Sequence, residues 1–125
     1  MATYSAAAKV AAHTAFRDLM DAETGTAKIR IRDNSNVLLA EIILSDPSGS
    51  VDAGTGQLTF SIATQETDAP ATGTADTAQF VDADDAVHLT LPCTQGTAAV
   101  SGECVLNSLD IIIGGDVSVL SAVVG

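Results

Sequence analysis

The stretch Lys28-Ile29-Arg30-Ile31-Arg32, residues 28–32, alternates cations with isoleucines. Successive side chains of a β-strand point to opposite faces, so this alternation predicts a half-buried strand with its charges outward and its isoleucines inward. Residues 33–36 are turn formers, and Val37 to Leu44 predicts a second strand. We expect that strand to end at Ser45-Asp46-Pro47, because proline cannot donate to a sheet ladder. The chain from residue 27 onward is therefore expected to be β-rich.

The same period of two continues toward the C-terminus between turn and loop signals. Further strands are expected at Leu58–Ile62, in a hairpin of Thr74–Val81 with Ala86–Leu91, and in a terminal hairpin of Leu109–Ile113 with Val117–Val124 closed by Gly114-Gly115. Seven or eight short strands with frequent turns predict a mainly β fold, specifically an antiparallel, jelly-roll-like β-sandwich over residues 26–125.

One short helix is expected to precede the strands. Ser5 can cap a helix over about residues 6–22, which Thr24-Gly25 would end. A polar stripe recurs every four residues: Lys9, His13, Arg17 and Asp21. The opposite, apolar face is formed by Ala8, Ala12, Ala15, Phe16, Leu19 and Met20. Such a helix must pack on its own sheet or on a neighbouring subunit. Residues 1–25 thus form a helix and turn within a single domain, 1–125.

Charge is unevenly distributed along the chain. All five Lys and Arg residues lie in the first 32 positions, whereas residues 33–125 carry thirteen of the sixteen acidic residues. Binding nucleic acid requires clustered cations, so the acidic body excludes nucleic acid as a partner, and it repels anionic membranes as well. No apolar run is long enough to span a bilayer or resembles a signal peptide, and we expect synthesis in the cytosol.

No constellation of residues indicates catalysis. His13 and His88 lack the spacing of a zinc site. The acidic run Asp82-Ala83-Asp84-Asp85 lacks the glycine and the distal glutamate of a calcium loop. Nucleophile-elbow and phosphate-loop motifs are missing, and four aromatic residues leave little material for a sugar platform. The expectation is a non-enzymatic protein without metal or cofactor.

Two cysteines flank the loop around residues 96–102. If the strands on either side pair, Cys93 and Cys104 could lie close enough for a disulfide or a thiol pair, and two independent buried thiols are the alternative. The cytosol would keep them reduced, whereas a released particle could oxidise them. Neither belongs to a C-x-x-C motif or lies near a cation, which argues against redox catalysis.

Three segments follow the helix and the first strand in a distinctive order: LLAEIILSDP (38–47), FVDADDAVHL (80–89) and LNSLDIIIGGDVSVLSAVV (106–124). Together they resemble small virion-associated proteins encoded among the head genes of tailed bacteriophages, in particular capsid decoration (cement) proteins built on β-sandwiches. The resemblance covers nearly the whole chain and rests on the order of its segments and on their general residue pattern. It implies a structural protein on the capsid surface, made in the host cytoplasm, that binds the major capsid protein lattice and stabilises the head. The alternatives are a tail, connector or head-fibre component, and a host-surface or carbohydrate-binding module.

The charge pattern suits such a role. An acidic body avoids packaged DNA, and a basic edge strand of Lys28, Arg30 and Arg32 offers a patch to an acidic neighbour. The alternative interpretation of that strand is a solvated face. The residues expected to bind partners are Lys9, Phe16, Arg17, Met20, Lys28, Arg30 and Arg32. The partners expected are the major capsid protein and further copies of the chain, as a dimer or trimer.

Overall fold

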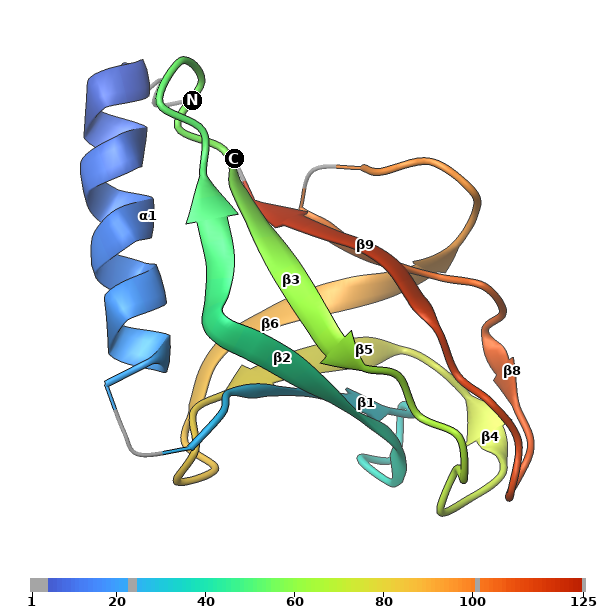
Figure 1. Ribbon diagram of the computed structural model, residues 1–125. Helices are drawn as coiled ribbons and strands as arrows, with labels where there is room; N and C mark the ends of the chain where they lie inside the picture. The colour runs from blue at the N-terminus through green and yellow to red at the C-terminus, as the bar shows by residue number, and fades with distance from the viewer. Residues whose placement is uncertain (1–4, 23–24, 101, 125) are drawn as a thin grey trace.

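The computed structural model describes residues 5–22, 25–100 and 102–124. One helix, α1 (Ala6–Met20), stands beside a closed barrel of seven strands in the order β1-β2-β3-β9-β7-β6-β5 (Figure 1). The barrel strands are β1 (Lys28–Arg32), β2 (Leu38–Val51), β3 (Leu58–Thr64), β5 (Thr77–Val81), β6 (Val87–Gln95), β7 (Glu103–Leu106) and β9 (Val119–Val124). Two short strands, β4 (Gly73–Thr74) and β8 (Asp110–Ile111), pair with each other at the end remote from α1.

The prediction of a mainly β chain with one N-terminal helix is confirmed. The finer prediction of a jelly-roll-like sandwich is not confirmed, because β1 pairs with β2 on one side and with β5 on the other and so closes the sheet. All neighbouring barrel strands are antiparallel except β6 and β7, which run parallel. Of the predicted helix-and-turn segment 1–25, residues 1–4 and 23–24 lie outside the described residues, and α1 ends at Met20, before the predicted stop at Thr24-Gly25.

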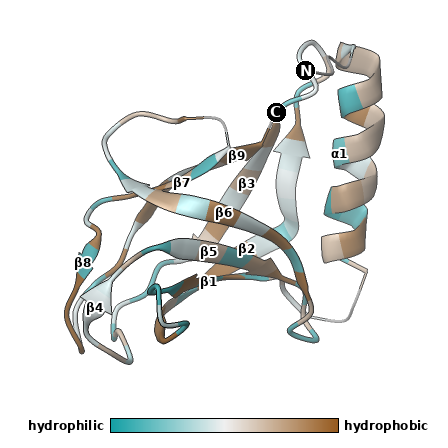
Figure 2. Ribbon diagram, turned by 180° about the vertical axis from the view of Figure 1, so that it is seen from behind, coloured by the Kyte–Doolittle hydropathy of each residue, from teal (hydrophilic) through white to brown (hydrophobic). Residues whose placement is uncertain are grey.

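Strand β1 has the alternation that its sequence predicts. Ile29 and Ile31 are fully buried, whereas Lys28, Arg30 and Arg32 are half-buried on the outer side. The description of β1 as an edge strand is wrong, because both of its sides are hydrogen-bonded to neighbours. Figure 2 shows the same period as teal and brown alternating along the barrel strands.

Strand β2 is longer than predicted. It continues through the cis Asp46-Pro47 bond to Val51 and bends as it does so (Figure 1). Its register against β3 shifts between Leu44 and Gly49, so the proline lies in a bulge where no ladder donor is needed. Pairing resumes at Gly49, where a Cβ would come within 2.6 Å of the Thr59 carbonyl oxygen.

The two predicted hairpins have different outcomes. The hairpin over residues 74–91 is confirmed in its central part, since β5 pairs with β6 across the turn at residues 82–86. The terminal hairpin is wrong: β8 pairs with β4, and β9 lies between β3 and β7. The Gly114-Gly115 turn forms, but it does not join two paired strands. Instead, the Gly114 amide and the Gly115 carbonyl form hydrogen bonds with the backbone of Ala69.

The core fills the barrel with aliphatic side chains around one aromatic pair. The rings of Phe60 and Phe80 lie with their centroids 4.5 Å apart. Phe16 of α1 meets Phe60 edge to face at 6.3 Å, and Met20 is 1% exposed. Helix α1 is therefore attached to the barrel core through its second half.

Candidate functional site

Helix α1 packs on the barrel by a different face from the one its sequence predicts. Ser5 caps it, accepting a hydrogen bond from the Ala8 amide at 3.2 Å. Phe16 and Met20 pack inward as expected. Met20 is buried among residues of its own chain, so it has almost no exposed surface with which to contact a partner, contrary to the prediction.

The polar stripe of α1 also turns toward the barrel. His13 Nδ1 donates to the Gly56 carbonyl oxygen, and the Asp21 carboxylate accepts from the Ser48 amide at 3.0 Å. Lys9 lies against Gly56, where its Cβ leaves no room for a side chain. The predicted placement of this stripe opposite the packed face is therefore wrong, because His13 and Asp21 hydrogen-bond to backbone groups of the barrel.

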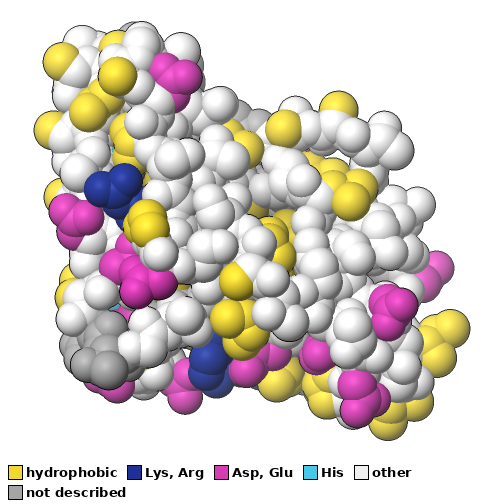
Figure 3. All heavy atoms as spheres, in the orientation of Figure 1, with side chains coloured by type: hydrophobic (Ala, Val, Ile, Leu, Met, Phe, Trp, Pro, Cys, Tyr) yellow, Lys and Arg dark blue, Asp and Glu magenta, His cyan; other side chains and the backbone are white. Residues whose placement is uncertain are grey.

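The face of α1 that points to solvent is consequently mainly apolar. Four of its exposed residues form what we call the outer helix face, namely Ala8, Ala11, Ala15 and Leu19, and the exposed Ala7 and Asp18 lie beside them. Leu19 is 49% exposed. In Figure 3, hydrophobic side chains gather over the position of α1. Alanine is among the residue types most often buried, which is why the sequence pattern placed this face inward.

A groove lies where α1 meets the barrel. It has a volume of about 290 Å³ and is lined by Ala12, His13, Phe16, Leu58, Leu89 and Val124. We call it the helix groove. A second hollow of about 300 Å³ shares Ala12 and His13 with it and includes Ala8 and Lys9. Sequence reasoning missed Leu58, Leu89 and Val124 here, since their strands meet α1 only in the folded chain.

The cations of β1 are engaged within the chain. Arg30 contacts Asp85 at 2.8 Å and Glu41 at 3.2 Å, and Lys28 lies within 4 Å of the same two carboxylates, at 3.7 and 3.9 Å respectively. Arg32 donates to the Gln79 side chain at 2.8 Å and to a turn carbonyl at 3.1 Å. The outward position predicted for these side chains is confirmed. Acidic neighbours match the charge of Lys28 and Arg30, however, and neutral acceptors take the hydrogen bonds of Arg32.

The two cations of α1 are less engaged. Arg17 lies 3.4 Å from Asp18, the next residue of the same helix, in an exposed pair. Within the described part of the chain, Lys9 forms no ion pair. Asp18 offsets the charge of Arg17, so the positive charge beside the helix groove is that of Lys9, which lines the adjoining hollow.

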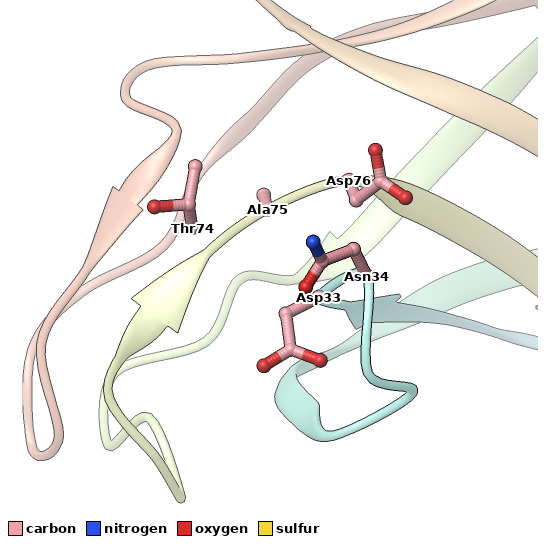
Figure 4. A pocket seen from close by; sticks show the side chains of 5 residues that line it. All are labelled: Asp33, Asn34, Thr74, Ala75 and Asp76. Atoms are coloured by element: carbon pink, nitrogen blue, oxygen red, sulfur yellow. The ribbon is translucent and has the colours of Figure 1, made fainter.

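A polar hollow of about 280 Å³ lies at the other end of the barrel, lined by Asp33, Asn34, Thr74, Ala75 and Asp76. Figure 4 shows that the Asp33 and Asp76 carboxylates point away from each other. Asp33 Oδ1 accepts from two amides of its own turn, at 2.8 and 2.9 Å. Among the described residues, no three His, Cys, Asp or Glu side chains converge as a metal site would require. The hollow thus follows from turn geometry.

Cys93 and Cys104 are opposite each other in the parallel pair β6–β7, both buried and both free thiols. The hydrogen bond with the Cys93 side chain raises the pKa of the Cys104 thiol far above its ordinary value, and burial adds to this shift. Of the predicted alternatives, the structure has the close thiol pair.

The Asp-rich turn has a structural explanation of its own. Asp82 Oδ1 accepts from the amides of Asp84 and Ala86, while Oδ2 lies 2.8 Å from His88 Nε2. The His88 hydrogen bond, followed by that from the Ala86 amide, lowers the pKa of the Asp82 carboxyl. Asp85 occupies the left-handed region at φ 68°, which Asp tolerates better than most residues.

Comparison with known proteins returns no relative: no family model, no curated protein and no solved structure matches this chain. Within the described residues, no helix combines the length and apolarity that crossing a membrane requires. The features of this chain that bear on function are α1, the helix groove and the barrel surface.

Proposed function

We propose that this protein is a non-enzymatic virion structural protein of a tailed bacteriophage, a capsid decoration protein that binds the major capsid protein lattice and stabilises the head. The observation that carries the proposal is the outer helix face, an apolar surface on a helix fixed to the barrel by Phe16 and Met20. The order of segments that resembles decoration proteins supports the same role.

Electrostatics favours a protein lattice over a polyanion as the partner. The chain carries a formal net charge of −11, and the three cations of β1 are matched by neighbouring acceptors. A surface of this kind is repelled by packaged DNA, so lattice binding depends on apolar contact. We therefore propose α1, rather than the basic strand expected from the sequence, as the element that contacts the capsid.

The size of the outer helix face limits the affinity of one copy. Fifteen residues at about 1.5 Å each give a helix about 22 Å long, and one side of it offers roughly 200 Å². A stable interface needs about 800 Å² per partner. Neighbouring elements of the same copy must supply the remaining interface area. Attachment of several adjacent copies to the lattice then raises the overall affinity without any new type of contact.

The test uses capsids of the phage that encodes the protein, prepared without it. Wild-type protein is added, and co-sedimentation and resistance of the heads to heat or to a chelator are measured. We expect binding across the shell and greater resistance. Leu19→Glu and Ala15→Glu should abolish both, because each places a charge on the outer helix face, whereas the matched variant Val37→Glu, at an exposed position away from α1, should bind normally.

Two results would overturn the proposal. Heads that neither bind the wild-type protein nor gain resistance rule out decoration. Labelled protein found at a single vertex of the particle would instead assign it to the connector or tail, whatever the behaviour of the variants.

A further inference from the structure

Two isoleucines at the end of the barrel remote from α1 are exposed. Ile112 and Ile113 are 68% and 64% exposed, the highest values among the large hydrophobic side chains in the described part of the chain. Ile111, their neighbour, is buried. Alternation along a strand would place Ile111 and Ile113 on one face and Ile112 on the other. The sequence therefore signals one exposed isoleucine, and Ile113 is exposed as well because β8 ends at Ile111.

The turn that carries these isoleucines is held by hydrogen bonds. The Gly115 amide donates to the Ile112 carbonyl at 2.8 Å, and the Gly114 amide donates to the Ala69 carbonyl at 2.8 Å. The Ile113 amide donates to Thr72 Oγ1 at 2.9 Å. We call Ile112 and Ile113 on this turn the isoleucine tip. Because the backbone is already ordered, burying the tip against another surface has a low entropic cost.

The helix groove offers a complementary surface at the opposite end of the molecule. Figures 1 and 2 both place α1 at one end of the barrel and the β4–β8 pair, next to the tip, at the other. The groove is lined mainly by apolar side chains and has a volume of about 290 Å³. Tip and groove of one chain cannot meet, but those of two copies can.

Charge around the two surfaces is complementary. Asp110 and Asp116 flank the tip in sequence, and Asp68 lies beside Gly114. Figure 3 shows acidic side chains next to exposed hydrophobic ones at this end of the barrel. Lys9 and Arg17, the cations of α1, lie on the helix that forms the groove. Asp18 lies 3.4 Å from Arg17 and offsets its charge, so the attraction that favours the encounter is between the acidic tip and Lys9, whereas tip-to-tip approach is opposed.

We infer that copies of this chain associate head to tail, with the isoleucine tip of one copy buried in the helix groove of the next. Such a contact joins two different surfaces, so it forms a closed ring, such as a trimer, when the rotation closes. The inference concerns the free protein and does not rest on the proposed capsid role. The outer helix face points away from the barrel and stays available to a lattice.

Sedimentation velocity over a concentration series of the full chain tests the contact. We expect reversible association of the wild type that depends on concentration. Ile112→Ser and Ile113→Ser should each weaken it about tenfold or more, because each removes one buried aliphatic side chain from the contact. Ala12→Glu should weaken it similarly by filling the groove with an acid. Val87→Ser, at a position 49% exposed elsewhere on the barrel, is the matched control and should associate as the wild type does.

Mixing the variants distinguishes head-to-tail contact from other modes. The double variant Ile112→Ser/Ile113→Ser keeps an intact groove, and Ala12→Glu keeps an intact tip. Each alone should be monomeric, yet an equimolar mixture should form a heterodimer that grows no further, since its outer ends lack a working partner surface. Circular dichroism of each variant verifies folding, and Ala12→Gln replaces Ala12→Glu if the latter fails to fold.

Three outcomes would overturn the inference. The first is a wild type that remains monomeric up to about millimolar concentration, the weak limit of specific association. The second is association that survives loss of both isoleucines. The third is a mixture of tip and groove variants that forms no heterodimer although both variants are folded.

Discussion

The attachment of α1 to the barrel depends on Phe16, and truncating this side chain is the most direct test of the helix orientation. Phe16→Ala removes the edge-to-face contact with Phe60 at 6.3 Å and part of the wall of the helix groove. Fully buried Phe→Ala substitutions cost about 3–5 kcal/mol, and Phe16 is only partly buried, so we expect a loss of about 2–3 kcal/mol in the free energy of unfolding.

This loss is large against the total stability of a domain, about 5–15 kcal/mol. With a urea m-value of about 2 kcal/mol/M, the unfolding midpoint should fall by roughly 1–1.5 M. The assay is urea unfolding followed by circular dichroism. The aromatic contact itself should contribute about 0.5–1.5 kcal/mol, measured as the coupling energy in a double-mutant cycle of Phe16→Leu with Phe60→Leu.

Leu19→Ala is the matched control. The sequence pattern assigns Leu19 and Phe16 to one apolar face, but the structure exposes Leu19 by 49% and packs Phe16 inward. Truncating Leu19 should therefore change the free energy of unfolding by no more than about 0.5 kcal/mol. If Leu19→Ala destabilises the protein as much as Phe16→Ala does, the helix packs by its alanine face and the orientation described above is refuted.

Three further predictions concern the barrel. Asp85→Asn should lower the free energy of unfolding by less than about 1 kcal/mol, and less at high salt, because its pair with Arg30 is partly exposed; a loss well above that would mean the pair is effectively buried. Folding lowers the pKa of Asp82, so the ionised carboxylate contributes to stability above the ordinary pKa of 3.8, and this contribution is lost as the pH falls through the folded pKa. The free energy of unfolding of the wild type, measured with urea, should therefore exceed that of Asp82→Asn by less in that acidic range. An advantage that grows there would contradict the assignment. Cys104 in the native protein should react with iodoacetamide at pH 8 at least about a hundredfold more slowly than in the urea-unfolded chain, because its raised pKa leaves little thiolate. The reaction is followed by mass spectrometry, and rapid labelling of the native protein would contradict the prediction.

Local pattern predicted the parts of the fold that depend on near neighbours in sequence. The alternation of residues 28–32 and the Asp82 turn each fix a strand or hairpin within a few residues, and both are found as expected. Closure into a barrel depends instead on which strands lie side by side, such as β5 against β1 and β9 between β3 and β7. Those pairings join segments far apart in the chain, and period-two alternation is the same whichever partner a strand has.

The candidate site was predicted less well, for two physical reasons. Alanine is often buried, so the helix pattern assigned Ala8 and Ala15, rather than the polar stripe, to the face that packs on the barrel. The orientation of the helix follows instead from two backbone groups of the barrel: the Gly56 carbonyl accepts a hydrogen bond from His13, and the Ser48 amide in the bulge of β2 donates one to Asp21. Such partners become visible only once the loops are placed.

Neighbours that only the fold brings together also change the role expected for the cations of β1. A run of cations on one strand can form a docking patch only if no acid of the same chain lies opposite it. In the folded chain, Glu41 of β2 and Asp85 of the β5–β6 turn both lie against Lys28 and Arg30. The positive charge of Lys28 and Arg30 is thus matched within the barrel, whereas no barrel residue pairs with Lys9 in the described part of the chain. Since α1 also presents the outer helix face and one wall of the helix groove, apolar contact and the charge of Lys9 coincide on this element. That coincidence makes the first helix, rather than the first strand, the element on which partner binding should be tested.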